Sequence, residues 1–186
     1  MTIAYAIIGL GVLIFVHELG HFAVSLGLGM RPRRFYIGFP PAIWSVKRNG
    51  IEYGVGAIPL GGFVKIPGMH RPGGVDVDAA FGLAREEAPE VGVTVDRLRA
   101  AIADGNEEIA LDLLGTLEGE LESRPLSPSA RRLATKGLED IRDALGPDAY
   151  WRAATWKRVA AIAAGPAANI LLAIILFTVL FMTSGK

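Results

Sequence analysis

The sequence predicts an α-helical membrane protein with two transmembrane helices, a membrane-associated β-hairpin and a soluble α-helical insertion between them. Three observations support this fold class. Hydrophobic residues make up 51% of the 186 residues, which is too apolar for an ordinary soluble domain of this size. Two apolar segments each exceed the ~20 residues that cross a bilayer. A hairpin signal and a polar, alanine-rich stretch separate them. We expect four regions, at residues 1–30, 31–72, 73–150 and 151–186.

The first apolar segment, "TIAYAIIGLGVLIFV", runs through "HELGHF" into "FAVSLGLG". Its N-terminal flank has no Lys or Arg, it is too long, and its polar stretch lies inside it. These features do not fit a cleavable signal peptide. We therefore expect residues 1–30 to form a transmembrane helix of the mature protein.

The hairpin signal is the Asn49-Gly50 pair in "IWSVKRNGIEYGVGAIPLGGFVKI", between two runs of strand-forming residues. It predicts a β-hairpin within residues 31–72. The second arm carries four glycines, Gly54, Gly56, Gly61 and Gly62. Glycine in a strand often marks a bulge or a place where another backbone approaches closely.

Residues 73–150 are acidic and alanine-rich, with apolar residues at helical spacing: Ile109, Leu113, Leu114 and Leu117. Ser127 or Ser129 is expected to cap a helix that ends near Gly146, and Asp104-Gly105 is expected to form a turn. The segment has no catalytic motif. It is either a regulatory or partner-binding element or a tolerated surface insertion.

The second apolar segment, "VAAIAAGPAANILLAIILFTVLFMT", predicts a transmembrane helix within residues 151–186. Basic residues flank the connection between the two helices: "RPRR" at residues 31–34 on one side, and Arg152, Lys157 and Arg158 on the other. The positive-inside rule then places the loop 31–155 in the cytoplasm of a multi-pass integral membrane protein. The 19 basic and 19 acidic residues leave no excess charge that would indicate nucleic acid as a partner.

The polar stretch of the first helix predicts a zinc site. His17 and His21 are four residues apart, so both imidazoles lie on one helix face. The H-E-x-x-H spacing supplies two zinc ligands, and Glu18 supplies the general base. Bound Zn²⁺ would also offset the cost of about 2.5–3.5 kcal/mol for an ionisable group inside a membrane span. In the alternative reading the histidines hydrogen-bond within a helix bundle or face a wet cavity. The chain has no cysteine, so metal ligands must be nitrogen or oxygen.

Three motifs, in order, resemble the site-2 type intramembrane zinc proteases. They are "HELGHF", the hairpin "RRFYIGFPPAIWS…GIEYGVGAIPLGGFVKIPGM", and "ATWKRVAAIAAGPAANILLA", which together cover residues 1–72 and 151–183. The resemblance implies zinc ligands at His17 and His21 and a catalytic base at Glu18. It also implies a substrate-holding role for Asn169, for which an interhelical hydrogen bond is the alternative. It implies single-span membrane substrates, such as anti-sigma factors, and a bacterial plasma membrane.

The hairpin gives this resemblance a physical role, because a helical substrate must unwind before its peptide bonds can be cleaved. An exposed strand edge could hold the unwound segment by β-addition. We therefore expect Gly54, Gly56, Gly61 and Gly62 to allow close approach of the substrate backbone. The alternative is a plain interfacial hairpin.

The sequence also departs from the family. The family's third zinc ligand is an Asp in an "LDG"-like motif on a later transmembrane helix, after one or more PDZ domains, and the sequence stops at Lys186 before either. Asp104 lies in the polar insertion, and the ligand role is not carried over to it. His70 is a conceivable substitute, but a loop such as "GMHRPGG" is more often just a turn. We expect the N-terminal part of such a protease, incomplete for catalysis alone. The alternative is a small non-catalytic membrane protein that binds zinc or a protein partner.

Overall fold

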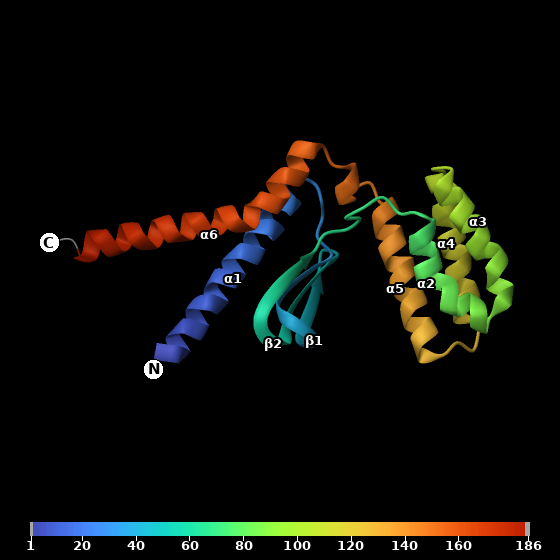
Figure 1. Ribbon diagram of the computed structural model, residues 1–186, viewed down its shortest axis with the longest axis horizontal. Helices are drawn as coiled ribbons and strands as arrows, with labels where there is room; N and C mark the ends of the chain where they lie inside the picture. Colours follow the sequence, from blue (N-terminus) through green and yellow to red (C-terminus); the bar gives the residue numbers. More distant parts are fainter. Residues whose placement is uncertain (1, 185–186) are drawn as a thin grey trace. The chain divides into compact units, whose positions relative to one another are not determined.

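The computed structural model describes residues 2–184 and divides the chain into two compact units (Figure 1). The helix–sheet unit comprises the chain up to Ile66 and from Ala153 onward. The insertion unit comprises Pro67–Arg152. The predicted helical insertion therefore folds around a core of its own.

Two long helices dominate the helix–sheet unit, α1 (Thr2–Gly27) and α6 (Thr155–Ser184). Both are long and apolar enough to cross a membrane, over Ala4–Gly27 and over the whole of α6. Large apolar side chains on both helices are exposed, among them Ile7, Ile174 and Phe181. A helix that is apolar on all sides and exposed in this way fits a bilayer better than water.

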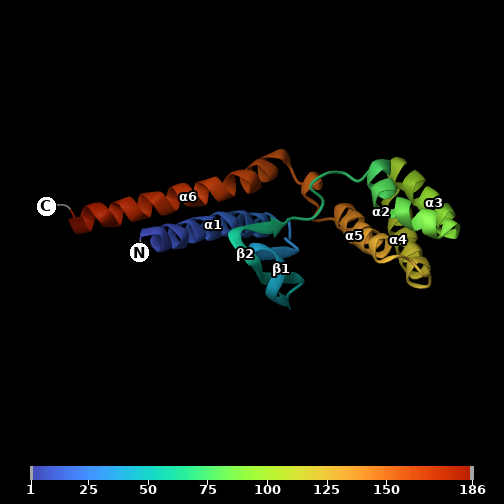
Figure 2. The ribbon, with the colours of Figure 1, turned by 60° about the horizontal axis from the view of Figure 1, so that its bottom comes forward.

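Small residues allow α1 and α6 to approach each other closely, and Figures 1 and 2 show α1 lying beside the first half of α6. A Cβ atom built on Gly20 would lie 2.8 Å from the Cβ of Ala168. At the end of α1, Lys157 Nζ donates to the Leu28 carbonyl over 3.1 Å. Pro166 lies inside α6, where a proline removes a helix hydrogen bond and favours a bend. Figure 1 shows α6 bent within its first half.

The predicted hairpin is present. Strands β1 (Arg34–Arg48) and β2 (Ile51–Lys65) pair through a turn in which Asn49 and Gly50 have φ angles of 52° and 80°. Positive φ at both central residues is the type I′ turn that an Asn-Gly pair favours. The local sequence therefore sets the register of the hairpin.

Both strands also bend back, so that the start of β1 is paired on two sides. Phe35 is paired with Tyr53 and with Val64, and Tyr36 with Gly54 and with Phe63. Residues 62–65 thus form an outer segment of the sheet, whereas residues 52–55 lie between two neighbouring segments. The aromatic rings of Phe22 and Phe35, 5.0 Å apart between centroids, pack α1 against this sheet.

A polar cluster of Arg34, Tyr36 and Glu52 connects the paired segments in the inner part of the sheet. The hydroxyl of the buried Tyr36 donates to the Glu52 carboxylate, and Arg34 Nε lies 3.1 Å from the same carboxylate. The hydrogen bond from Tyr36, with the charge of Arg34, holds the pKa of Glu52 below its usual value despite its partial burial. The same hydrogen bond and burial raise the pKa of Tyr36.

The insertion unit packs helices α2 (Gly74–Glu87), α3 (Gly92–Ala103), α4 (Glu107–Glu122) and α5 (Pro128–Leu145), with short 3₁₀ turns at Pro89–Val91 and Tyr150–Arg152. Its fully buried side chains include Val77, Phe81, Leu98, Leu114 and Leu117. Ser127 caps α5 by accepting a hydrogen bond from the Ala130 amide over 3.1 Å. The expected turn at Asp104-Gly105 ends α3, with φ of 72° at Gly105.

The buried face of α4 does not include every apolar residue at helical spacing. Leu114 and Leu117 are buried, but Ile109 is 50% exposed, and its neighbour Ala110 is buried. The inward face of α4 follows the i, i+4, i+7 spacing from Ala110 through Leu114 to Leu117. The small Ala110 side chain gave too weak an apolar signal to mark this face.

Candidate metal centre

His17 and His21 lie one turn apart on α1 and point their outer nitrogens toward each other. The two Nε2 atoms are 3.2 Å apart, and the ring planes are inclined by 78°. Two nitrogens that bind one tetrahedral zinc ion at about 2.0–2.1 Å lie roughly 3.3–3.4 Å from each other. The observed separation therefore fits two ligands of one ion.

The protein backbone orients His21. Its Nδ1 atom lies 2.7 Å from the carbonyl oxygen of Ala161 on α6. A carbonyl only accepts, so Nδ1 carries the proton and Nε2 keeps its lone pair for a ligand. Histidine ligands in metal sites commonly donate their second ring nitrogen in this way.

Asn169 lies beside the other histidine. Its Nδ2 atom is 3.2 Å from His17 Nδ1, and its Oδ1 atom is buried without a hydrogen-bond partner in the described part of the chain. The structure thus brings Asn169 to the two histidines, 152 positions away from His17 in sequence.

Gly165 provides the room that the two imidazoles occupy. A Cβ atom built on this glycine would overlap His21 Nε2 and would lie 2.6 Å from His17 Nε2. Sequence reasoning missed Gly165 and the Ala161 carbonyl. The available signal was their spacing, since residues 161, 165 and 169 recur every four positions and share one face of α6.

Glu18 is half-buried and faces the sheet. A Cβ atom on Gly62 would lie 3.0 Å from Glu18 Cγ, so the outer segment of β2 lies directly against the carboxylate side chain. The expected base and one of the four glycines are therefore neighbours.

The nearest atoms to the other three glycines belong to the sheet itself. A Cβ on Gly54 would overlap the Tyr36 ring, and one on Gly56 would overlap the Phe39 backbone. Gly61, with φ of 149°, lies against the Phe39 ring. Gly54 and Gly56 serve close packing within the sheet, whereas Gly61 directly precedes the segment beside Glu18.

Among residues 2–184, no group of three or more His, Cys, Asp or Glu side chains lies close enough to hold a metal ion. Asp104 ends α3 in the insertion unit. His70 is also in the insertion unit and pairs with Asp76 over 2.9 Å. Within the described residues, the candidate centre thus offers two nitrogen donors, those of His17 and His21.

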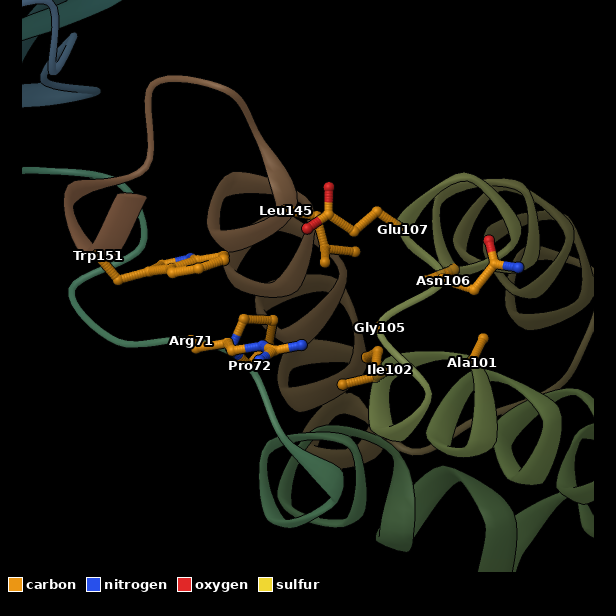
Figure 3. Close-up of a pocket in the computed structure, with 10 residues that line it drawn as sticks. Arg71, Pro72, Ala101, Ile102, Gly105, Asn106, Glu107, Leu145 and Trp151 are labelled. Carbon is orange, nitrogen blue, oxygen red and sulfur yellow. The ribbon is translucent and has the colours of Figure 1, made fainter. Parts of the chain in front are cut away.

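A small, open depression lies on the insertion unit (Figure 3). Arg71 and Trp151 line one side, and Asn106 and Glu107 line another. The guanidinium of Arg152 lies 4.5 Å from the Trp151 ring centroid and pairs with Glu107. The space it offers is about that of one water molecule, far below the about 300–1,000 Å³ of typical ligand sites, so we assign no ligand to this depression.

The residues of the centre fit zinc. Both imidazoles offer converging nitrogens, and a carboxylate follows the first of them on the same helix. These features define the class of protein as an H-E-x-x-H metalloprotein whose site lies on an apolar helix.

The family is shown directly. The model of Peptidase family M50 matches residues 5–186, and the chain therefore belongs to peptidase family M50, the site-2 protease family of zinc-dependent metalloproteases. The resemblance drawn from the three motifs is confirmed.

Several relatives are similar to the chain. A Chlamydia pneumoniae protein assigned as a zinc metalloprotease is 31% identical over 189 residues, covering 100% of this chain and 21% of its own length. The regulator of sigma-W protease RasP of Bacillus subtilis is 29% identical over 99% of this chain and 46% of its own length. Zinc metalloprotease Rip1 of Mycobacterium tuberculosis is 52% identical over 54 residues, or 29% of this chain and 13% of Rip1. The chain thus spans about a fifth of the length of the Chlamydia pneumoniae protein and about half of the length of RasP.

Proposed function

We propose that this chain supplies two zinc ligands and the general base of a zinc-dependent intramembrane endopeptidase that cleaves single-span membrane proteins, such as anti-sigma factors, within or near the bilayer. The observation that carries the proposal is the 3.2 Å approach of His17 Nε2 to His21 Nε2, with Glu18 on the same helix beside the outer segment of β2. Family membership and the name of RasP, a regulator of sigma-W, support the class of substrate.

His17 and His21 would hold the zinc ion, which when bound lowers the pKa of water and polarises a carbonyl group. Glu18 would take a proton from the attacking water while the water oxygen bonds to the peptide carbonyl carbon. The C–N bond then breaks, and Glu18 passes the proton to the leaving amine. A further ligand, from outside the described residues, would complete the coordination of zinc.

The sheet would present the substrate to Glu18. Residues 62–65 are the outer segment of β2, so an unwound substrate could pair with them as an added strand. Gly61 and Gly62 would allow the substrate backbone to approach, and Gly62 adjoins Glu18. Asn169, on α6, would offer an amide N–H group to the substrate.

The protein would be a multi-pass protein of a bacterial plasma membrane, with the loop 31–155 in the cytoplasm. The exposed apolar surfaces of α1 and α6 support membrane insertion. Arg31, Arg33, Lys157 and Arg158 near the helix ends support the orientation. The exposed Ile43 and Trp44 on the sheet support contact of the hairpin with lipid.

Glu18→Gln tests the proposal in the protein expressed from its natural coding sequence. We expect zinc content to match wild type and cleavage of a co-expressed single-span substrate to fall by at least about 100-fold, the size of a general-base contribution. Leu19→Ala, at the neighbouring 40% exposed position, is the matched control and should cleave normally. Cleavage at the wild-type rate by Glu18→Gln would refute the assigned base.

A second candidate function is that of a non-catalytic membrane protein that binds zinc or a protein partner. It is favoured by the finding that, among the described residues, no third candidate ligand accompanies the two histidines. The same experiment separates the two functions. Zinc at one ion per chain, without cleavage of any tested membrane substrate by wild type, would support the second.

A further inference from the structure

The hydrogen bonds around the two imidazoles form a chain from Asn169 to Ala161. Asn169 Nδ2 lies 3.2 Å from His17 Nδ1, His17 Nε2 lies 3.2 Å from His21 Nε2, and His21 Nδ1 lies 2.7 Å from the Ala161 oxygen. For neutral imidazoles, one placement of protons satisfies all three contacts. Asn169 donates to His17 Nδ1, His17 Nε2–H donates to His21 Nε2, and His21 Nδ1–H donates to the carbonyl.

A metal ion requires a different placement, because both Nε2 atoms must offer lone pairs. His21 already meets this requirement. His17 must move its proton from Nε2 to Nδ1, where it would face the amide N–H of Asn169, and two donors would then oppose each other.

A half turn of the Asn169 amide about its Cβ–Cγ bond removes this conflict. The turn replaces Nδ2 with Oδ1, which accepts a hydrogen bond from His17 Nδ1–H. Oδ1 is buried and has no hydrogen-bond partner in the described residues, so the turn breaks no bond that this oxygen makes. The amide thus fits the metal-free pair in one orientation and the metal-bound pair in the other.

We propose that Asn169 is a positioning residue that sets the tautomer of His17, donating to its Nδ1 atom without metal and accepting from it when metal is bound. The proposal rests on the proposed zinc centre and adds a role beyond contact with substrate. An aspartate at this position can only accept, so it selects the metal-binding tautomer. A leucine of similar size selects neither.

The first test measures the tautomer directly, by nitrogen-15 NMR of labelled imidazoles in the metal-free protein in detergent micelles. We expect His17 to carry its proton on Nε2 in wild type and on Nδ1 in Asn169→Asp. His21 should keep its proton on Nδ1 in both, because Ala161 accepts from it. The same His17 tautomer in both proteins would overturn the proposal.

The second test measures zinc affinity by competition with a chelator. We expect Asn169→Leu to bind zinc about 10- to 100-fold more weakly, the usual cost of losing a partner behind a histidine ligand. Asn169→Asp should bind at least as tightly as wild type, and Ile170→Ala, at a position 62% exposed, should match wild type. Rescue by Asp separates a tautomer effect from a loss of packing.

The outcomes also separate this proposal from the proposed function. If wild type binds no zinc, the zinc centre itself is refuted. If wild type binds zinc and Asn169→Leu binds it equally well while KM for a membrane substrate rises, Asn169 contacts substrate alone and the tautomer role is refuted.

Discussion

His17 and Gly165 face each other across the contact between α1 and α6, where a Cβ atom on the glycine would lie 2.6 Å from His17 Nε2. The proposed metal centre therefore depends on a residue without a side chain, which lies in a helix of 30 residues. Elsewhere in a helix, glycine costs about 0.8–1.0 kcal/mol relative to alanine. Its presence here follows from the space that the imidazoles need.

Gly165→Ala should weaken zinc binding by at least about 10-fold, although both histidines and Glu18 remain. The new methyl group would displace the imidazoles from each other. Chelator competition measures the change. Gly11→Ala on α1, where no atom lies within 4 Å of the built Cβ, is the control and should bind normally. Normal binding by Gly165→Ala would show that the imidazoles meet elsewhere.

His21→Ala should lower zinc affinity by at least about 100-fold, since it removes a ligand rather than a partner of a ligand. Metal analysis after dialysis against a weak chelator measures the loss. Leu26→Ala, on α1 and 41% exposed, should retain zinc. Equal zinc content in the two variants would argue against a site on this helix.

The Tyr36–Glu52 hydrogen bond should stabilise the sheet at neutral pH, and this stabilisation should be lost in acid. The folded pKa of Glu52 is lowered, mainly by Tyr36, so the unfolded chain takes up the proton first as pH falls below about 4.3. The stabilisation is present above that pH and is lost as pH falls through the folded pKa. Hydrogen-exchange protection of β1 and β2 amides from pH 6 to about pH 3 measures this.

Tyr36→Phe should reduce this pH dependence, and Glu52→Gln should abolish its Glu52 component. An unchanged pH profile in both variants would mean that other carboxyl groups cause the acid sensitivity. The raised pKa of Tyr36 affects stability in alkali: its contribution to the stability of the sheet is lost as pH rises above about 10.

Gly137→Val should destabilise the insertion unit by about 1–3 kcal/mol, because a Cβ on Gly137 in α5 would overlap the Ala80 side chain in α2. Hydrogen exchange of the α2–α5 amides in the whole protein measures the change. Gly115→Ala on α4 meets no atom within 4 Å and should stabilise α4 by up to about 1 kcal/mol. Equal protection in the two variants would contradict the close α2–α5 contact.

Single cysteines should report the membrane topology, because the chain contains none of its own. Asp112→Cys, on the exposed side of α4, should react with an impermeant maleimide only after cell lysis. Ser184→Cys, at the end of α6, should react in intact cells. The reverse pattern would invert the proposed orientation.

The sequence by itself determined the local features. Helical spacing placed His17 and His21 on one face, Asn49-Gly50 specified the turn, and the lengths of the apolar segments specified two long helices. Each depends on residues within a few positions of one another, so short-range geometry is sufficient. The exposed Ile109 and buried Ala110 show where even this signal failed.

Only the tertiary structure decided what surrounds these features. It set Ala161 and Asn169 against histidines 140 and 152 positions away, and it folded both strands back so that Gly62 reached Glu18 while Gly54 and Gly56 did not. These neighbours depend on the crossing of α1 and α6 and on the bending of the sheet. Packing between distant segments fixes both, and no local periodicity encodes it.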